Sequence, residues 1–463
     1  MNDLGNSLAS RDIAHVLHPY TNLDLHRSKG PMIVDRGKGV MIYDEDGKEY
    51  IEGLAGLWCA SFGFGEQELV EAAIEQMRKL PFYHQFAHKS SMPSIELAEK
   101  LKQIAPVQFS KVFFGNSGSE ANDTQVKLQW YYNNAIGKPQ KKKIISRIKG
   151  YHGVTIASAS LTGLPANHLD FDLPLPQIKH VSAPYYYRGA EPGETEDEFT
   201  TRLAKELEDR IIAEGPDTVA AFIAEPVMGA GGVIVPPQGY FRKIQAVLSK
   251  YDVMMIADEV ICGFGRTGNM WGCQTFDIQP DTLSCAKALS SAYLPISAIM
   301  INDDIYEAMV EQSKKIGTFA HGFTYSAHPV CAAVALRTME LMEERNIIGH
   351  VQAVMPRFQQ RLRQFADHPL VGEVRGVGLV GAVELVADKA TKAPFAPKPS
   401  VGAKCSDFAQ EAGLICRPLG DSMAFCPPLI ISESEIDEMF DRFGKALDAT
   451  AAWVKKEGIG KAA

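Results

Sequence analysis

This sequence of 463 residues lacks several features that mark whole classes of protein. Basic residues are outnumbered, 47 to 56, and the net charge of −9 argues against a nucleic-acid binder. No stretch reaches the ~18 uninterrupted apolar residues of a membrane span. The polar segment 1–11 carries no apolar signal region. We therefore expect a cytoplasmic enzyme.

The eight cysteines also lack a recognisable pattern. They form no C-x-x-C pair and show no metal-ligand spacing with histidine. We expect reduced thiols, mostly small core residues, and no metal site. The chain shows no internal repeat and no low-complexity segment either.

The middle of the chain alternates strand and helix patterns. After a strand at 111–114 comes a helix at 119–135, and further strands are predicted at 143–148, 218–224, 253–257, 283–285 and 295–301. Several are continuous apolar runs, which indicates strands buried on both faces of a mainly parallel sheet. At this length we expect two or three structural units.

The two ends of the chain have a different character. The N-terminal stretch is polar and irregular up to about Pro31, and a hairpin around Asp46-Gly47 follows. Helices are predicted at 66–80, 94–104, 329–345 and 349–367, short strands at 371–386 and near 414–428, and a loop at 388–400. A final helix begins near Ser432. We predict a large domain at 61–330 and a smaller α+β domain at 331–463, which residues 1–60 join.

Two ionisable residues stand where buried strands should stop. Asp258 ends the apolar run that begins at Val253, and Lys287 ends the run that begins at Thr282. Ligands gather at the carboxyl ends of strands in open α/β sheets. A lysine that forms a Schiff base and a carboxylate that pairs with a ring nitrogen suit pyridoxal 5′-phosphate. An ordinary salt bridge is the alternative.

A glycine- and serine-rich turn precedes the helix at 119–135. The segment Gly115–Asn122 offers tight turns, two serine hydroxyls and the free N–H groups of a helix start. This is a candidate phosphate site. In the alternative, Ser119 is a simple helix cap without a ligand.

The segment Gly263–Gly268 fits the pattern G-x-G-x-x-G after a strand. A dinucleotide site would need a helix to open there, and the residues that follow, 269–274, do not show a helical pattern. We therefore reject a nicotinamide or flavin site and expect a surface loop that borders the active site.

Taken together, these segments resemble the class III, fold-type I aminotransferases that use pyridoxal phosphate. Six pieces match in the order of that family and cover most of the large domain: Asn116–Asn122, Tyr151-His152-Gly153, Glu225-Pro226, Asp258–Gly268, Lys287–Ser291 and Thr324-Tyr325-Ser326. The resemblance implies a fold-type I α/β fold with a large, mainly parallel sheet and a smaller α+β domain.

The resemblance also implies a role for each residue. Lys287 would hold the cofactor as a Schiff base and then move the substrate proton, while Asp258 would keep the ring nitrogen protonated. The ring would lie between Val260 and Tyr151. Further cofactor contacts are implied for Ser117, Gly118, Ser119, His152 and Glu225. Thr324 would complete the phosphate site of a neighbouring subunit, which makes a homodimer, or a tetramer of two dimers, necessary.

Within that family the chain most resembles transaminases that move an amino group from an amine or ω-amino acid to pyruvate. Trp58 matches an aromatic wall of the substrate pocket, and Tyr20, Phe86, Tyr151 and Ala230 match further pocket positions. Arg417 matches a mobile arginine that binds carboxylate groups. A surface arginine is the alternative for Arg417.

Three functions remain open from the sequence. The first is a ping-pong transaminase that takes an amine donor and a 2-oxo acid acceptor. The second is a decarboxylase or aminomutase on the same scaffold, which would use the same lysine and aspartate. The third is a non-catalytic protein that kept the fold, against which the intact Lys287 and Asp258 argue.

Overall fold

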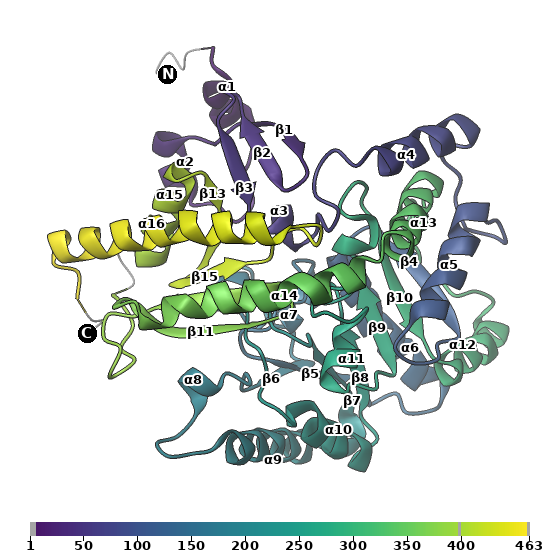
Figure 1. Ribbon diagram of the computed structural model, residues 1–463. Helices are drawn as coiled ribbons and strands as arrows, with labels where there is room; N and C mark the ends of the chain where they lie inside the picture. The colour runs from purple at the N-terminus through teal and green to yellow at the C-terminus, as the bar shows by residue number, and fades with distance from the viewer. Residues whose placement is uncertain (1–5, 397–399, 461–463) are drawn as a thin grey trace.

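A seven-stranded sheet forms the centre of the large domain. The computed structural model describes residues 6–396 and 400–460 and is shown in Figure 1. Neighbouring strands follow the order β4 (Lys111–Gly115), β10 (Ser297–Ile301), β9 (Thr282–Cys285), β8 (Met254–Asp258), β7 (Val219–Ala224), β5 (Lys143–Arg147) and β6 (Ile178–Val181). The strands between β9 and β6 pair in parallel, and β10 alone runs antiparallel to both its neighbours. The predicted fold-type I α/β class with a mainly parallel sheet is confirmed.

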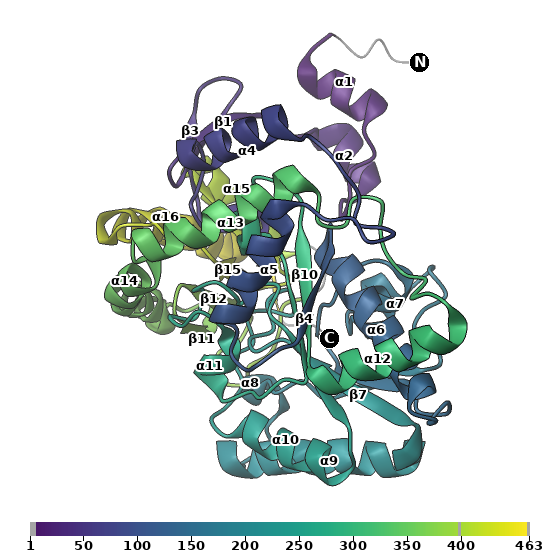
Figure 2. The ribbon, with the colours of Figure 1, turned by 90° about the vertical axis from the view of Figure 1, so that its right-hand side faces the viewer.

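Helices cover both faces of this sheet, which explains the continuous apolar runs. On β7 the side chains alternate: Ala221 and Ile223 pack with Val126 and Leu161 on one face, and Phe222 packs in the main core on the other. The first face carries α6 (Gly118–Ala135), α7 (Ile156–Leu161) and α12 (Asp303–Ile316). The second carries α5 (Met92–Ile104), α9 (Glu196–Glu214), α10 (Tyr240–Lys250) and α13 (Pro329–Glu344). Figure 2 shows α6 and α12 on the side of β4 and β10 away from α5 and α13.

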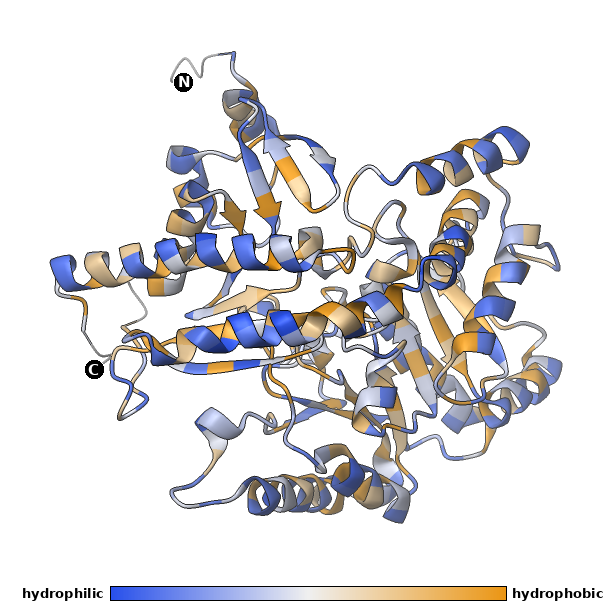
Figure 3. Ribbon diagram, in the orientation of Figure 1, coloured by the Kyte–Doolittle hydropathy of each residue, from blue (hydrophilic) through white to orange (hydrophobic). Residues whose placement is uncertain are grey.

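The outer helices are amphipathic. In Figure 3, α9, α14 (Ile347–Arg363) and α16 (Glu433–Glu457) alternate between hydrophilic and hydrophobic residues around their circumference. Their apolar positions face the core and their charged positions face outward, as expected for helices that cover a sheet. Ser432 caps α16, since its hydroxyl accepts a hydrogen bond from the backbone N–H of Glu435.

Two four-stranded sheets lie beside the large one. The first consists of β1 (Val34–Lys38), β2 (Met41–Asp44), β3 (Glu49–Glu52) and β13 (Leu414–Ile415), where β13 pairs in parallel with β3. The second consists of β11 (Val371–Val377), β12 (Val380–Leu385), β15 (Ser422–Phe425) and β14 (Arg417–Leu419). Segments from both ends of the chain therefore share one sheet. The proposed domain boundaries stay a prediction, and part of the predicted loop 388–400 lies outside the described residues.

The remaining helices and turns are α1 (Leu8–His15), α2 (Leu23–Lys29), α3 (Ala55–Trp58), α4 (Gln67–Lys79), α8 (Tyr186–Gly189), α11 (Gly272–Phe276), α15 (Val401–Glu411), η1 (Pro165–Asn167), η2 (Pro216–Thr218), η3 (Lys287–Ser290) and η4 (Gln364–Asp367). Of these, α4 packs against α13 and α15 packs against α16, while the others span eight residues or fewer. No helix in the described part of the chain is both long and apolar enough to cross a bilayer.

The expectation of an irregular N-terminal stretch is wrong. The stretch forms α1 and α2, whose N-termini are capped by the side chains of Ser7 and Asn22. Neither helix buries a residue fully, so neither has the long apolar stripe by which we recognised the other helices. Local capping, and not core packing, marks these two helices in the sequence.

The expectation of a surface loop at the glycine-rich segment Gly263–Gly268 is wrong, because all residues of this segment are buried. Arg266 donates hydrogen bonds from Nη1 to the backbone oxygens of Leu379 and Pro427. A side chain at Gly265 would lie within 2.8 Å of Ile348 Cδ1. The glycines therefore allow close packing between the large sheet and the smaller sheets. No helix begins within the segment.

Candidate active site

The carboxyl ends of β7, β8 and β9 meet the start of α6 around one cavity of about 160 Å³. Twelve of the fifteen predicted site residues line this cavity. They are Tyr20, Trp58, Gly118, Ser119, Tyr151, His152, Glu225, Ala230, Asp258, Val260, Lys287 and Arg417. A larger hollow of about 840 Å³ lies at the amino ends of β8 and β9 and contains none of these residues. Folding thus brings together side chains from segments up to 397 positions apart.

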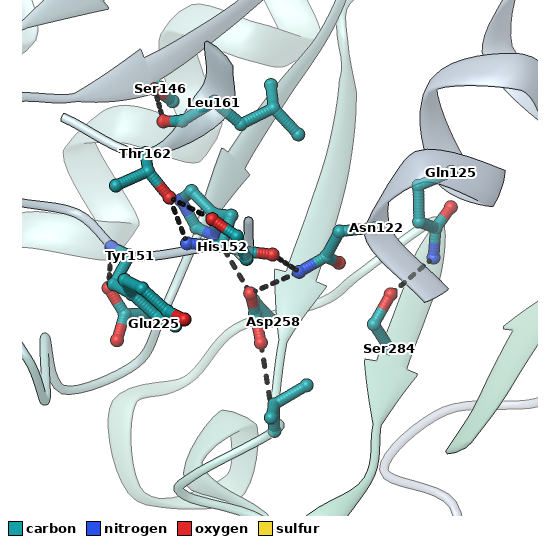
Figure 4. A network of polar contacts seen from close by, with 12 residues as sticks. Asn122, Gln125, Ser146, Tyr151, His152, Leu161, Thr162, Glu225, Asp258 and Ser284 are labelled. Atoms are coloured by element: carbon teal, nitrogen blue, oxygen red, sulfur yellow. Dashed lines mark hydrogen bonds and ion pairs between the residues drawn. The ribbon is translucent and has the colours of Figure 1, made fainter. Parts of the chain in front are cut away.

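Asp258, the last residue of β8, is held by three hydrogen bonds (Figure 4). Its Oδ2 accepts from Asn122 Nδ2 and from His152 Nδ1, both at 2.7 Å, and its Oδ1 accepts from the backbone N–H of Val260 at 3.1 Å. The carboxylate is only 3% exposed and has no lysine or arginine partner among the described residues. A buried negative charge without a cation is costly unless a ligand supplies one.

Lys287 follows β9 and begins the turn η3. Its backbone has φ +52°, a left-handed conformation that is strained for a residue with a side chain. Burial lowers the pKa of its amine, although the negative charge of Asp258 acts in the opposite direction. The amine makes no hydrogen bond or ion pair within the described chain. The first alternative, an ordinary salt bridge between Lys287 and Asp258, is not formed.

Glu225 ties Tyr151 to the end of β7. Its Oε1 accepts from the backbone N–H of Tyr151, and its Oε2 accepts from that of Gly229, each at 3.0 Å. Burial raises the pKa of the Glu225 carboxyl, and nearby Asp258 raises it further. Glu225 therefore positions both the Tyr151 segment and the loop that leads to Ala230.

The start of α6 has the geometry of an anion site. Ser117 is the N-cap, with its hydroxyl accepting from the backbone N–H of Glu120 at 3.2 Å. The first-turn N–H groups have no acceptor within the helix, and they carry the positive end of its dipole. A Cβ atom at Gly118 would lie 3.1 Å from Val260, and one at Gly153 would lie 2.8 Å from Ser119 Cα. Only glycine fits this narrow cradle comfortably.

The opposite side of the cavity is aromatic and carries one cation. Tyr20 accepts a hydrogen bond from Asn167 Nδ2 at 2.6 Å. Burial raises the pKa of Tyr151, and the neighbouring Tyr20 adds to the shift. Burial lowers the pKa of Arg417, whereas the nearby Tyr151 and Tyr20 act to raise it. Arg417 is half-buried and pairs with no carboxylate of the described chain, so the alternative of an exposed surface arginine does not hold.

Three predicted residues lie outside the cavity. Ser117 caps the helix from just beyond its lining. Thr324 is exposed on the segment between α12 and α13, and Phe86 is 49% exposed. The Phe86 ring packs over Gly322, where a Cβ atom would lie 2.8 Å from its Cε1. Phe86 and Thr324 therefore come from neighbouring loops.

The sequence analysis did not assign a role to Asn122. This buried amide donates to Asp258 Oδ2 at 2.7 Å and to the backbone oxygen of His152 at 2.8 Å. It lies four residues after Gly118 on α6, and that spacing places both on the same face of the helix. Gly153, which belongs to the matching piece Tyr151-His152-Gly153, also lines the cavity, as do Leu57 and Ile261, to which the sequence analysis gave no role.

The family model of class III aminotransferases (Aminotransferase class-III) matches residues 25–447 of this chain. The chain is a class III aminotransferase. This supports the first of the three functions that the sequence left open over the decarboxylase or aminomutase and over a protein without catalysis.

Relatives of known structure share the fold over nearly the whole chain. An omega transaminase from Pseudomonas jessenii, in complex with PMP, has a TM-score of 0.96 and 57% identity, covering 97% of this chain and 99% of that one. A thermostable omega transaminase variant, W58M/F86L/R417L, engineered for asymmetric synthesis of enantiopure bulky amines, has a TM-score of 0.95 and 56% identity, covering 97% and 100%. Gamma aminobutyrate transaminase 3, chloroplastic, from Solanum lycopersicum is 50% identical over 96% of this chain and 87% of its own length.

Class III aminotransferases use pyridoxal 5′-phosphate, and the cavity fits that group. The free Lys287 amine suits its aldehyde, and the buried Asp258 carboxylate suits a protonated ring nitrogen. Asn122 Oδ1 and His152 Nε2 are buried without a partner, which leaves polar atoms for a ligand at this site. The start of α6 suits the phosphate.

The loop that carries Trp58 contains three residues with positive φ, Ala55, Gly56 and Trp58. Glu52, at the end of β3, accepts a hydrogen bond from the backbone N–H of Leu54 at 2.8 Å and so fixes the start of this loop. Burial raises the pKa of the Glu52 carboxyl from 4.5 to about 7, against the effect of these backbone bonds.

This raised pKa predicts a pH dependence of stability. The folded state holds the Glu52 proton more tightly than the unfolded state, so its contribution is complete below about pH 4.5 and is lost as pH rises through about 7. Glu52→Gln cannot ionise, so its Tm relative to wild type should be higher at pH 8 than at pH 5. The exposed Glu45→Gln is the control. Equal Tm differences at both pH values would contradict the prediction.

Proposed function

We propose that this enzyme moves the amino group of a hydrophobic primary amine or an ω-amino acid to pyruvate or another 2-oxo acid. One observation carries the proposal: the unpaired, half-buried guanidinium of Arg417 lies at an otherwise aromatic end of the cavity, beside Tyr20 and Tyr151. Such a pocket can accept an aromatic or alkyl group, and it can also pair with a carboxylate.

The residues of the chain divide the chemistry among them. When bound, pyridoxal phosphate supplies an aldehyde that takes up the amino group and a ring that accepts electrons. Lys287, with its lowered pKa, has the free-base form needed to take a proton from the substrate carbon and return it. Asp258 would pair with the ring nitrogen and favour its protonated form, and its own position is fixed by Asn122 and His152. A ping-pong cycle follows, because donor and acceptor occupy the same cavity in turn.

Substrate class is supported from two directions. The relative from Solanum lycopersicum is named for gamma-aminobutyrate, an ω-amino acid whose carboxylate Arg417 can pair with. The engineered relative for bulky amines carries changes whose numbers and original residues match Trp58, Phe86 and Arg417 of this chain. The same pocket residues therefore support both an ω-amino acid and a hydrophobic amine as donor.

A homodimer, or a tetramer built from dimers, is part of the proposal. Phe86 and Thr324 lie outside the cavity of their own chain, on packed neighbouring loops. Around them are exposed aromatic residues, Phe82 at 37%, Tyr83 at 45% and Tyr325 at 58%. Such a patch is typical of an interface, from which Phe86 and Thr324 can reach the cavity of a second copy. Sedimentation of the holoenzyme as a monomer at micromolar concentration would exclude this arrangement.

The compartment we propose is the cytoplasm. All eight cysteines are free thiols, and seven of them are buried. Free thiols are typical of a reducing compartment. A disulfide in the protein isolated from its cells under alkylating conditions would contradict this assignment.

An absorbance spectrum tests the proposed function directly. The holoenzyme should have a band near ~410–420 nm that gives way to one near ~330 nm when 1-phenylethylamine or 4-aminobutyrate is added without a keto acid. Pyruvate should restore the first band and yield alanine. A spectrum that responds to neither donor would reject the proposed substrate class, while leaving the family assignment intact.

Ala230 is expected to set the size of the smaller substrate group. It is half-buried in the cavity wall, where a larger side chain would occupy space next to the substrate. Ala230→Phe should increase the preference for 1-phenylethylamine over 1-phenylpropylamine about 10- to 200-fold, the range in which pockets discriminate one methylene. The ratio of kcat/KM for the two amines measures it, with exposed Ala246→Phe as the control. An unchanged ratio would contradict the prediction.

Arg417 is expected to separate the two donor classes. Arg417→Met keeps an unbranched stem and removes the charged guanidinium, so a carboxylate-bearing donor loses its partner. Single-turnover rates with 4-aminobutyrate should fall about 100-fold, near the value of a charged hydrogen bond, and those with 1-phenylethylamine by less than about threefold. The absence of a keto acid keeps acceptor binding out of the comparison. Equal losses for both donors would mean that Arg417 only supports the fold.

A further inference from the structure

Three side chains near the N-terminus converge on one point outside the active site. Asp12 lies on α1, His18 in the following loop and His26 on α2, two helices that lie next to each other in Figures 1 and 2. His18 Nε2 lies 2.7 Å and His26 Nε2 lies 3.2 Å from the same atom, Asp12 Oδ1. The two imidazole rings are 4.2 Å apart, with a tilt of 38°. Spacings of six and eight residues match no common metal motif, so sequence analysis did not identify the cluster.

The geometry is close to that of a metal-ligand set. In a tetrahedral zinc site with bonds of about 2.0 Å, neighbouring ligand atoms are about 3.3 Å apart. The His26–Asp12 separation of 3.2 Å already matches that value, and the His18–Asp12 separation of 2.7 Å needs to lengthen by about half an ångström. All three ligand atoms lie within 4.8 Å of one another. Two imidazole nitrogens and one carboxylate oxygen are ligands that zinc prefers.

The three side chains are partly open to solvent, and the carboxylate of Asp12 offers a negative charge that a cation can neutralise. The side chains of His18, Asp12 and His26 are 26%, 18% and 10% exposed, so water has access to the cluster from one side. No lysine or arginine of the described chain pairs with Asp12, although Arg11 and Arg27 are close in sequence. The imidazoles are therefore the only ring partners of Asp12 among the described residues, and a bound cation would neutralise the carboxylate charge.

We propose that Asp12, His18 and His26 bind one divalent transition-metal cation, for which Zn²⁺ is the best match, with water as the fourth ligand. Binding replaces three water ligands of the hydrated ion by two Zn–N bonds to the Nε2 lone pairs and one Zn–O bond, with no change of oxidation state. The ion would join α1, the loop and α2 into one rigid unit. These helices bury no residue fully, so they lack the core packing that otherwise fixes a helix.

The site has a consequence for the active site. Tyr20 lies two residues after His18, with φ +50°, and it lines the substrate cavity. Its hydroxyl accepts from Asn167 and adds to the raised pKa of Tyr151. A cation that fixes the residues on both sides of Tyr20 would also hold this wall of the cavity in place. The role is structural positioning, distinct from the chemistry at Lys287.

Metal binding is tested on the cofactor-loaded enzyme after treatment with a chelator, with ZnCl₂ as the probe in calorimetry. Wild type should bind one Zn²⁺ per chain. Asp12→Asn and His26→Gln should each bind this ion about tenfold more weakly or not at all. His15→Gln, an exposed histidine of α1, is the matched control and should bind as wild type does. All variants keep the eight cysteines, so zinc binding to thiols is the same in each.

Two further readouts separate a built site from loose binding. Co²⁺ in place of zinc should give the strong visible bands of a tetrahedral site in wild type and in His15→Gln, and not in Asp12→Asn. Zinc should also slow tryptic cleavage at the exposed Arg11 and Arg27 in wild type and in His15→Gln, and not in Asp12→Asn. Equal zinc affinity in wild type and in the double variant Asp12→Asn/His18→Gln would overturn the proposal and leave the three residues as a hydrogen-bonded cluster only.

Discussion

Replacing Lys287 by alanine is expected to reduce turnover by about four to six orders of magnitude while the protein stays folded. The amine is the only lysine amine that lines the cavity at the ends of the strands, and it has no partner within the described chain. Alanine removes both the attachment point of the cofactor and the base that moves the substrate proton.

The measurements must separate lost chemistry from lost structure. Lys287→Ala should lose the band near ~410–420 nm that depends on the lysine, while circular dichroism and oligomeric state match wild type. Lys141→Ala is a useful contrast, because that lysine is 5% exposed and pairs with Asp252 away from the cavity. We expect Lys141→Ala to lower Tm and to keep kcat. Turnover in folded Lys287→Ala within tenfold of wild type would refute the assigned role.

The central sheet, and the two charged residues at the carboxyl ends of its strands, could be predicted from the sequence. Strand predictions at 111–114, 143–148, 218–224, 253–257, 283–285 and 295–301 each correspond to an observed strand, with ends that differ by one or two residues. This succeeded for the inner strands because they are buried on both faces, which demands continuous apolar runs, whereas β4 at the sheet edge is only partly buried. β6 was missed because two of its four residues, Lys179 and His180, are polar and only partly buried at the sheet edge.

Other features depend on distant contacts that no local pattern contains. The segment Gly263–Gly268 contains polar residues and glycines, as loops do, but Arg266 is buried because backbone oxygens more than 110 residues away satisfy its guanidinium. In the same way Asn122 appears as one of several polar residues on α6 until Asp258 is brought next to it. Phe86 and Thr324 were predicted from family resemblance, and both lie outside the cavity of their own chain.

The position of Asp258 explains why its charge matters more than its shape. Both of its oxygens accept hydrogen bonds from the protein: Oδ2 from Asn122 and His152, Oδ1 from Val260. These donors orient the carboxylate, which lies almost wholly buried. A carboxylate oriented in this way would pair with the nitrogen of a bound ring.

Asp258→Asn is therefore expected to lower kcat by about 10²- to 10³-fold, or about 3–4 kcal/mol of transition-state stabilisation. The amide removes the negative charge, and its NH₂ group must face either the Val260 N–H or the Asn122 and His152 donors. Because the electrons of the broken C–H bond need a protonated ring, the loss should appear in kcat more than in KM.

A second aspartate provides the matched control. Asp281 also accepts a backbone hydrogen bond, from Met255 at 2.7 Å, but it lies just before β9, away from the cavity. Asp281→Asn should lower Tm and leave kcat within about twofold, since it changes a comparable carboxylate without reaching the cofactor. If Asp258→Asn holds the cofactor, as its bound absorbance would show, and turns over at a rate within about fivefold of wild type, the carboxylate is only a structural partner of His152. A large kcat loss with retained cofactor would instead show that the charge itself drives the reaction.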